Sequence, residues 1–502
     1  MDHGELCSEM QVACATILER TSTGRPRLSS GFSDGNVAVD DGNACVHLAV
    51  MARRKCIKGA SNIGSLHFIS PSINVNSNRL LWARSASKLA AVKSTRTPSA
   101  TSALSEQFDT LHASLEIVES THDQTNGESA VRPDILCVFA SGHHRGRFAD
   151  AIDLFRSSLH PAHILAATVE SVICNTREVE RSAGLSVLAL TLPNVVVRPF
   201  WFDTADGPPA VWDRGFIRER VSLPPDEGAG NGALTHRGII MLSDPHSFSS
   251  ADACAAIDDA AGPQGARIFG GIASGAHHAG LNVLAVDRRL SHSGAVGLSI
   301  FGDVALDGFM SQGCSPIGPR FIITKAHDHT IVEIGGKRAI DAAREMLDAL
   351  PEGMRQLVEN GILIGIARDA AKRNLGRDDF IVRLTLGVDQ DTGSFTLSHP
   401  VRAGMTMQFH VRDAVGASQD LSMCLDAEQL REPVVAALLL NCSSRGSSLF
   451  GVANHDAEKI SRRLAGPPIA GCSCAGEFAI RDHRTYVHCH AASAVMFRAL
   501  HS

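Results

Sequence analysis

A strand–loop–helix–strand pattern occurs three times along this chain, and it constrains the fold more than any other feature. Each copy begins with an apolar strand, passes through a loop of small residues into a helix, and ends in a second strand. The copies span residues 134–173 (DILCVFASGHH…), 237–276 (RGIIMLSDPHS…) and 434–479 (VVAALLLNCSS…). Three copies of one supersecondary unit predict a duplicated α/β fold with mixed β-sheets flanked by helices.

The length of the chain indicates more than one domain, because 502 residues exceed what one hydrophobic core usually holds. We expect a disordered leader and linker over residues 1–130, with one short helix after residue 106. The globular part begins near Pro133. We expect it to divide into an N-terminal domain over residues 131–313 and a C-terminal domain over residues 314–498.

Between the repeats, local patterns predict further β-structure. The apolar runs 185–192 and 195–202 predict two antiparallel strands joined at Pro193 and Asn194. Residues 380–412 predict a β-meander with a turn at the sequence DQDTG.

The first part of the chain has an unusual charge pattern. Residues 42–105 contain no Asp or Glu, but they contain nine Arg and Lys and many Ser. This composition is typical of an organelle transit peptide, although such a peptide should begin the chain. We therefore hypothesise a start at Met51, or an over-extended gene model, with import into a chloroplast or mitochondrion. The alternative is a disordered tail on a cytoplasmic protein.

Composition and motifs exclude several classes of function. A net charge of −6 gives no electrostatic case for nucleic-acid binding, and no apolar run approaches the roughly 20 residues needed to cross a membrane. The 13 cysteines are scattered without C-x-x-C pairs, which favours a reducing compartment over a disulfide scaffold. The phosphate-loop motif and a convincing dinucleotide motif are both absent, so we expect no cofactor.

Several stretches together resemble the FIST family (F-box and intracellular signal transduction proteins). GCSPIGPRFIITKA with the following IVEIGGKRAIDAAREML resembles the opening of the family's C-terminal domain. LLLNCSSRGSSLFG and GPPIAGCSCAGEFA resemble its closing motifs. IFGGIASG and LSIFGDVALDGFMSQGCSPIG are similar to parts of its N-terminal domain. The resemblance covers roughly residues 134–497 and implies two FIST domains.

The resemblance also implies a function, and the sequence departs from the family in two places. FIST domains are expected to be sensory domains for small molecules, with amino acids as the proposed ligands. The first unit carries AATVES where the family turn usually has Gly-Cys-Ser, which weakens the case for a site there. No F-box precedes the FIST region, which weakens the case for a role in a ubiquitin ligase.

The motif G-C-S-x-x-G occurs twice and predicts two backbone nests after strands. Small residues in such a turn leave amide groups free to hold a carboxylate. The alternative is a tight turn that packs against a neighbouring unit. The candidate residues of the two turns are Gly313, Cys314 and Ser315, and Gly471, Cys472, Ser473 and Gly476.

Two charged residues near the second turn suit a zwitterionic ligand. Arg445, between Cys442 and Gly446, can grip a carboxylate at two points, and Glu477 can take an ammonium group. The alternative is that Arg445 and Glu477 pair with each other or cap local backbone.

Catalytic and metal sites have little support. Cys314, Cys442 and Cys472 lie in loops beside strand ends, but no His and acid stand at the spacing of a catalytic dyad. Cys472, Cys474 and the cysteine and histidines of residues 483–490 lack the spacing of a closed zinc site. We therefore expect neither a catalytic residue nor a metal.

The sequence thus predicts a non-catalytic protein that binds a small molecule such as an amino acid and signals its presence, with a protein partner in that signalling as a further expectation. One alternative is a protein-recognition module related to F-box receptors. Another is an enzyme that uses a cysteine.

Overall fold

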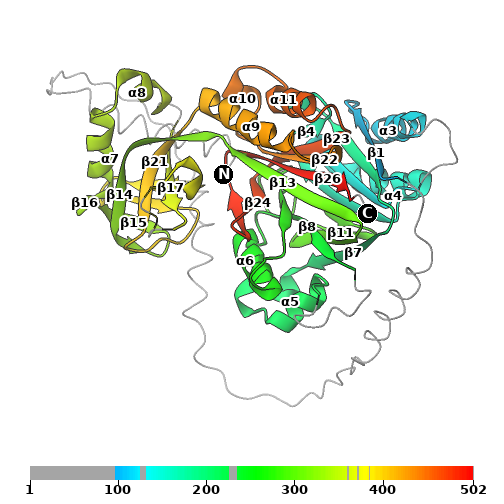
Figure 1. Cartoon of the computed structure of the whole chain (residues 1–502), viewed down its shortest axis with the longest axis horizontal. Coiled ribbons are helices and arrows are strands. Elements are labelled where there is room, and N and C mark those ends of the chain that lie inside the picture. Colours follow the sequence, from blue (N-terminus) through cyan, green and yellow to red (C-terminus); the bar gives the residue numbers. More distant parts are fainter. Residues whose placement is uncertain are drawn as a thin grey trace, which may run out of the picture.

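The chain folds into a larger and a smaller lobe (Figure 1). The computed structural model describes residues 97–124, 132–224, 234–358, 361–369, 372, 374–383 and 385–500. The larger lobe contains three six-stranded sheets, and the smaller lobe contains an eight-stranded one. The predicted mixed α/β class is confirmed. Residues 1–96, which hold most of the expected leader and Met51, lie outside the described residues.

All three predicted units are present, each as two parallel strands joined by a helix. The units are β2 (Ile135–Ser141), α4 (Phe148–Leu159) and β3 (His163–Val169), then β8 (His236–Ser243), α6 (Ser250–Ala261) and β9 (Ile268–Ile272), then β22 (Val434–Cys442), α11 (His455–Arg463) and β23 (Ile469–Cys474).

Each unit lies at the centre of a sheet, and the three sheets share one strand order. Two antiparallel strands extend the sheet on one side of the parallel pair, and a hairpin extends it on the other. The first sheet is completed by β1 (Ser99–Ser105), β6 (Leu185–Thr191), β10 (Leu284–Val286) and β11 (Arg289–Ser291). The second is completed by β7 (Val195–Phe202), β12 (Ala295–Gly302), β24 (Gly476–Arg481) and β25 (Arg484–His488). The third is completed by β13 (Val304–Gln312), β26 (Ala491–Ala499), β4 (Val172–Cys174) and β5 (Arg177–Val179).

The hairpins are exchanged in a cycle. The β4–β5 hairpin follows the first unit in sequence but pairs with β23 of the third, where Val172 lies opposite Cys472. The β10–β11 hairpin follows the second unit and pairs with β3 of the first. The β24–β25 hairpin follows the third unit and pairs with β9 of the second. Each sheet is therefore built by two units, and the units are interlocked.

Alternating strand residues explain why the three sheets pack together. Leu438 and Leu440 of β22 face a central core to which all three sheets contribute. Leu439, between them, faces outward and packs with Ile460 of α11. The period of two in a strand buried on both faces places one set of side chains in the shared core and the other under a helix. The same division holds for β2, whose Phe139 faces inward.

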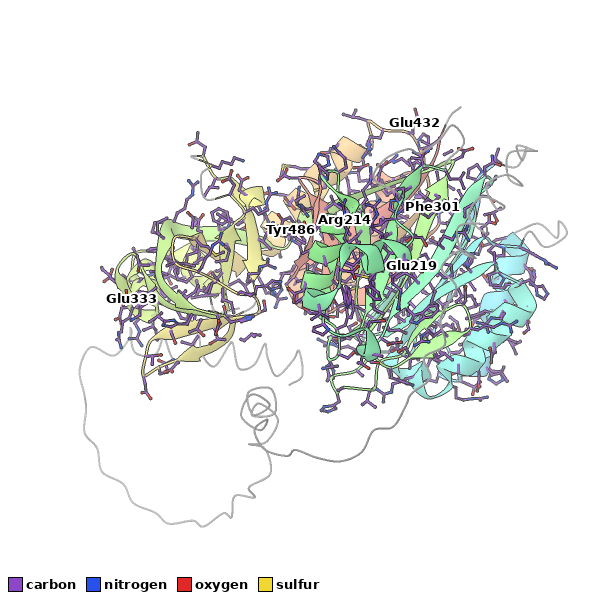
Figure 2. The ribbon with its side chains drawn as sticks, turned by 90° about the horizontal axis from the view of Figure 1, so that it is seen from below. Arg214, Glu219, Phe301, Glu333, Glu432 and Tyr486 are labelled. Atoms are coloured by element: carbon purple, nitrogen blue, oxygen red, sulfur yellow. The ribbon has the colours of Figure 1, made fainter. Side chains whose placement is uncertain are left out.

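The smaller lobe interrupts the third unit's sheet between β13 and the helix α9 (Ala414–Glu428). It has its own core, centred on Ile323, Met346 and Phe409. A hydrogen bond from Arg383 Nη1 to the Val487 carbonyl (3.1 Å) joins it to β25 near Tyr486, at the junction of the lobes in Figure 2. Its elements are β14 (Cys314–His327), β15 (Thr330–Ile334), β16 (Lys337–Arg338), α7 (Ala339–Asp348), α8 (Glu352–Val358), β17 (Ile362–Ala367), β18 (Phe380–Arg383), β19 (Thr385–Asp389), β20 (Ser394–Leu397) and β21 (Thr406–Arg412).

The remaining helices lie outside the sheets. They are α3 (Thr110–Gln124), α5 (Arg214–Arg220) and α10 (Ser447–Phe450), with 3₁₀ turns at Gly142–Arg147, Thr204–Asp206, Pro209–Val211 and Arg377–Asp379. None of the helices in the described ranges is long and apolar enough to cross a membrane.

Two predicted strand pairings are wrong. The expected hairpin of 185–192 and 195–202 does not form, because β6 pairs with β1 and β2 whereas β7 pairs with β12 in another sheet. The expected meander reduces to one hairpin of β19 and β20, since β18 pairs with β17 and β21 with β14. Local alternation identifies strands but not their partners, which here lie far away in sequence.

The expected leader and linker contain structure at their end. Ser99–Ser105 forms the edge strand β1, and the helix expected after residue 106 is α3, which packs on the first sheet. The Ser-rich strand is stable at this edge because its hydroxyls have partners: Ser102 Oγ donates to Asn175 Oδ1 (2.8 Å) and Ser105 Oγ to Glu116 (2.6 Å). The expected helix is therefore present, whereas a disordered leader is wrong for residues 99–105.

Candidate functional site

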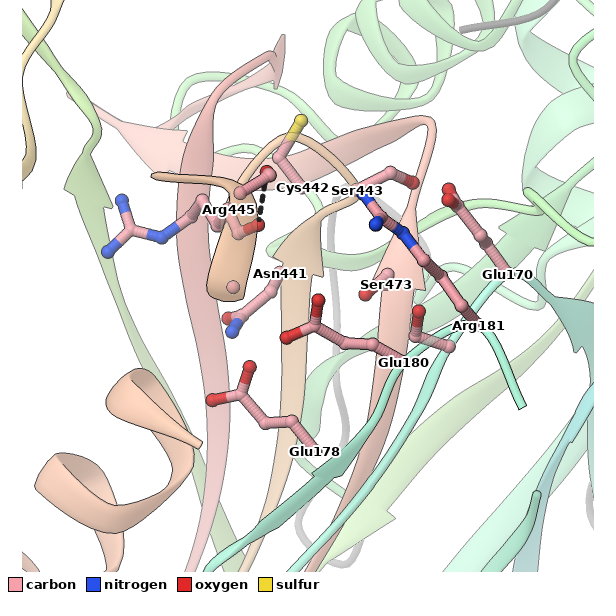
Figure 3. Close-up of a pocket in the computed structure, with 12 residues that line it drawn as sticks. Glu170, Glu178, Glu180, Arg181, Asn441, Cys442, Ser443, Arg445 and Ser473 are labelled. Carbon is pink, nitrogen blue, oxygen red and sulfur yellow. Dashed lines mark hydrogen bonds between the residues drawn. The ribbon is translucent and has the colours of Figure 1, made fainter. Parts of the chain in front are cut away.

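A small polar pocket lies at the carboxyl ends of the parallel strands β22 and β23 (Figure 3). In open α/β sheets, ligands commonly bind at this edge, because loops diverge there and leave a crevice. The pocket offers about 30 Å³ of space to water-sized molecules. It is lined by Glu170, Ser171, Glu178, Glu180, Arg181, Asn441, Cys442, Ser443, Arg445, Gly446, Ser448 and Ser473.

The acidic wall of the pocket comes from the hairpin that the first unit gives to the third sheet. Glu178 lies on β5, and its Oε1 accepts a hydrogen bond from the Ala457 amide (2.8 Å) in the first turn of α11. Glu180 accepts two hydrogen bonds from Ser447, from the amide (2.9 Å) and from the hydroxyl (2.6 Å), at the start of α10. Carboxylates are stabilised at helix N-termini, where amide groups lack intrahelical partners. The two acids thus hold both helices of the loop region.

Gly446 allows Glu180 to approach. Its φ of 70° lies in the left-handed region, and a Cβ there would lie 2.6 Å from Glu180 Oε1. Any side chain at this position would displace the carboxylate from Ser447.

Glu178 is poised to titrate near neutral pH. Burial raises the pKa of this carboxyl to about 7, helped by the negative charges of Asp456 and Glu180. The Ala457 amide and Arg445 lower the same pKa but do not outweigh burial. The carboxyl of Glu178 is therefore near the midpoint of its titration at neutral pH, so a bound cation can compete with its proton.

Arg445 is held by an acid other than the predicted one. Its Nε donates to Asp456 Oδ2 (2.6 Å) and its Nη2 to Asp456 Oδ1 (3.0 Å), and both residues are buried. Burial by itself would raise the pKa of Asp456, but Arg445 and the neighbouring His455 hold it at about 2. The Arg445 guanidinium also lies 5.2 Å from the ring centre of Phe450. Figure 3 shows this guanidinium turned away from Glu180, so Arg445 stabilises the loop rather than presenting its charge to the pocket.

Asn441 contributes an unused acceptor. Its Nδ2 donates to Asp456 Oδ2 (3.1 Å), which fixes the orientation of the amide. Its Oδ1 has no hydrogen-bond partner among the described residues, although the side chain is only 2% exposed. A buried acceptor without a partner is costly, so a donor from a ligand or water would stabilise it.

Arg181 is the exposed cation of the pocket. Within the described part of the chain it forms no hydrogen bond or ion pair. Figure 3 shows its guanidinium extending over the pocket in the direction of Ser443. The pocket therefore combines carboxylates inside with a positive charge at the rim.

Comparisons with known proteins identify the family. The FIST N domain matches residues 134–337, and the FIST C domain matches residues 339–480. Uncharacterized protein Mb0898c of Mycobacterium bovis is 32% identical over 400 residues, which cover 78% of this chain and 96% of the relative. This chain belongs to the FIST family. Uncharacterized protein Rv0628c of Mycobacterium tuberculosis is 30% identical over 377 residues, which cover 73% of this FIST protein and 91% of the relative.

Among solved structures, the FIST protein aligns with a cyanuric acid hydrolase from A. caulinodans. The identity is 8% and the TM-score 0.34, over 81% of this chain and 100% of the hydrolase. A similarity this low carries no argument about function.

The structure brings only part of the predicted site of the FIST C domain to the pocket. Cys442, Arg445, Gly446 and Ser473 line it, whereas the other predicted residues do not. Those outside the lining are Gly313, Cys314, Ser315, Gly471, Cys472, Gly476 and Glu477.

The predicted Gly-Cys-Ser turns are wrong, because both stretches are extended strands. Gly471, Cys472 and Ser473 lie within β23, and Cys314 begins β14. A Cβ on Gly471 would lie 1.8 Å from the Leu439 carbonyl oxygen, and one on Gly313 would lie 2.2 Å from that of His490. These glycines therefore permit the close packing that the alternative expected, but in strands rather than in tight turns. Ser315 donates to Asp413 Oδ2 (2.8 Å).

Glu477 is a buried acid without a partner in the described part of the chain. Neither carboxylate oxygen meets hydrogen-bond geometry, and the residue is 0% exposed. Burial raises its pKa well above the ordinary value, and nearby Cys474 adds to this, while the Ala491 amide and Arg445 act in the opposite direction. Burial therefore favours the neutral form of the Glu477 carboxyl, and no hydrogen bond joins this carboxyl to Arg445 in the described part of the chain.

The cysteines of the predicted site are buried thiols. Burial raises the pKa of Cys442 and of Cys314 to about 12. Ser444 Oγ donates to Cys442 Sγ (3.2 Å) and contacts His490 Nδ1 (2.5 Å). Cys472 and Cys474 lie side by side with sulfurs 3.7 Å apart. Across the described ranges, no three His, Cys, Asp or Glu residues are arranged to hold a metal ion.

Sequence reasoning missed the residues that make the pocket charged: Glu170, Glu178, Glu180, Arg181 and Asn441. The signal was the charged run REVER at residues 177–181, directly after the first unit. Its meaning depends on the hairpin exchange, which places it beside a strand roughly 260 residues later in the sequence.

Proposed function

We propose that this FIST protein binds a small zwitterionic molecule, such as an amino acid, in the pocket at the ends of β22 and β23, and signals its presence. The observation that carries the proposal is the arrangement of charge. Arg181 lies unpaired at the rim, while Glu178 lies on the same side of the pocket as the unpartnered Asn441 oxygen, and Glu170 also lines the pocket. A carboxylate suits the guanidinium and an ammonium group suits the acids. Arg181 thus takes the role that was expected of Arg445, and the acids of the pocket take the role that was expected of Glu477.

The proposed role is non-catalytic. The thiol of Cys442, which lines the pocket, has its pKa raised to about 12 by burial, so it carries almost no thiolate at neutral pH. This supports binding over cysteine chemistry.

The signal would pass through α10 and α11. Glu178 and Glu180 line the pocket and also accept hydrogen bonds from the N-termini of these helices. A ligand that pairs with these carboxylates therefore changes the strength of their hydrogen bonds to the helices. Beside them, α9 exposes Val415 (66%) and Met423 (62%), and Leu430 beyond its end is 89% exposed. These apolar side chains favour α9 as the surface for a protein partner.

For localisation, we propose organelle import. The support is the acid-free, Arg- and Ser-rich composition before β1. Since β1 is part of the first sheet, processing is expected before Ser99.

A thermal-shift screen of the full chain against the amino acids tests the binding proposal. Ligand binding stabilises the native state by about 2.7 kcal/mol when the ligand is at 100 times its Kd. We expect at least one small amino acid to raise the Tm, and Arg181→Gln to reduce the effect. Arg462→Gln, an exposed arginine on α11, is the matched control. No shift with any amino acid would contradict the proposal.

A further inference from the structure

We infer that the pocket takes a primary ammonium group as the buried end of the ligand and leaves the ligand's carboxylate at the rim on Arg181. This rests on the proposed function and specifies it. The recognised class is a small molecule with a free primary amine and a carboxylate close to it.

The pocket is small, and its exposed cation lies at the rim. The space of about 30 Å³ that it offers to water-sized molecules exceeds the roughly 10–15 Å³ that one water molecule requires, so a group as small as ammonium fits inside. Arg181 is exposed and extends over the pocket, so a ligand carboxylate that meets it lies at the rim.

The lining of the pocket selects the charge. The Asn441 oxygen is buried and unpartnered, and it accepts but cannot donate. Glu178 uses one oxygen for the Ala457 amide, which leaves the other available, and the half-buried Glu170 adds a further carboxylate to the lining. A buried carboxylate would face these like charges at short range, whereas an ammonium group offers three donors to them.

Binding of an ammonium group displaces a proton from Glu178. The protonated carboxyl loses its proton to solvent, and the carboxylate then pairs with the ammonium; no other bond forms or breaks. Burial, with Asp456 of α11 and Glu180 of its own hairpin, raises the pKa of Glu178 to about 7, against the Ala457 amide and Arg445. Glu170 and Arg181 also face the pocket, and His455 neighbours Asp456. The free protein therefore holds most of this proton at about pH 6.

The affinity should follow this proton. Below about pH 7 the affinity for the amine rises with pH by up to roughly tenfold per unit, because the proton competes with the ligand. Above the pKa of Glu178 the affinity levels off. Up to about one proton is released per ligand at pH 6.

Isothermal titration calorimetry of the full chain tests this inference with glycine, N-acetylglycine and methylamine as probes. Titrations at about pH 6 in two buffers of different ionisation heat give the number of protons released. We expect proton release with glycine, weaker but measurable binding of methylamine, and binding of N-acetylglycine weaker by roughly 10- to 100-fold, because the charged donors are lost.

The variant Glu178→Gln separates charge from structure, since its amide oxygen can still accept from Ala457. It should bind glycine more weakly at pH 8 and without proton release at pH 6. Glu219→Gln, an exposed acid on α5, should behave as the unmodified chain.

The outcomes distinguish the inference from the function on which it rests. Equal affinity for glycine and N-acetylglycine, or glycine binding without proton release, would overturn the buried ammonium and leave ligand binding intact. If none of the amino acids binds, both are overturned.

Discussion

Arg445 and Asp456 form a buried two-point ion pair, with Nε–Oδ2 at 2.6 Å and Nη2–Oδ1 at 3.0 Å. The pair fastens the loop after β22 to the first turn of α11. Asn441 of β22 donates to the same carboxylate, so strand, loop and helix meet at one acid. The arginine that the sequence indicated as a ligand grip is therefore part of the frame around the pocket.

Breaking this pair should destabilise the protein strongly. Asp456→Asn leaves the Arg445 charge buried without its counter-ion, and we expect a loss of about 3–5 kcal/mol in the free energy of unfolding. Urea denaturation followed by circular dichroism measures it. Arg462→Gln, exposed on the same helix, should cost less than about 0.5 kcal/mol. A loss below about 1 kcal/mol for Asp456→Asn would show that the pair contributes little.

Glu477 should make the protein less stable as pH rises. The folded-state pKa of this acid lies above its unfolded value, so the native state keeps a proton that the unfolded state loses above about pH 4.5. Its contribution is fully present below that pH and falls by up to about 1.4 kcal/mol per pH unit until the folded pKa is reached. Glu477→Gln removes the effect. Denaturation at pH 5 and pH 8 should show the variant gaining on the unmodified chain at pH 8; a difference that does not change with pH would refute this.

Close packing of β22 and β23 depends on Gly471. A methyl group there would lie 1.8 Å from the Leu439 carbonyl oxygen, so Gly471→Ala forces the strands apart. We expect a loss of about 1–3 kcal/mol, measured as a lower urea midpoint. Gly353→Ala, in α8 with open space around it, is the control and should be neutral or slightly stabilising. Equal effects of the two changes would rule out the steric argument.

The hairpin exchange should prevent the C-terminal part from folding alone. Residues 314–500 lack β13, which pairs with β26, and the β4–β5 hairpin, which pairs with β23. Expressed alone, this part should show little near-ultraviolet circular dichroism and no cooperative unfolding, because two strand edges and the central core are exposed. Co-expression with residues 97–313 should restore both signals. A cooperatively folded isolated part would contradict the interlocked architecture.

Features that depend on residues close in sequence were predicted correctly, whereas features that depend on residues distant in sequence were not. The strand–helix–strand order of all three units follows from local periodicity, so it was predicted from the sequence. The partners of β6 and β7 were not, since pairing is decided by contacts distant in sequence. The Ser-rich β1 has a composition typical of a leader, yet side-chain hydrogen bonds fix it at a sheet edge.

The pocket shows the same limit. The family motif around Cys442 and Arg445 pointed to the correct loop, because it follows a strand of the conspicuous third unit. The roles of the residues within that loop could not be predicted. Arg445 pairs with Asp456, 11 residues further on, and the acids of the pocket follow the first unit in sequence. The Gly-Cys-Ser stretches were read as turns, since small residues serve close strand packing and turns alike.

A crystal structure of the chain with glycine at saturating concentration tests the central claim most directly. We expect glycine density at the ends of β22 and β23, with the glycine nitrogen within about 3 Å of the Asn441 oxygen and a Glu178 oxygen, and the glycine carboxylate toward Arg181. Density elsewhere on the molecule, or the carboxylate inside and the nitrogen at the rim, would contradict it.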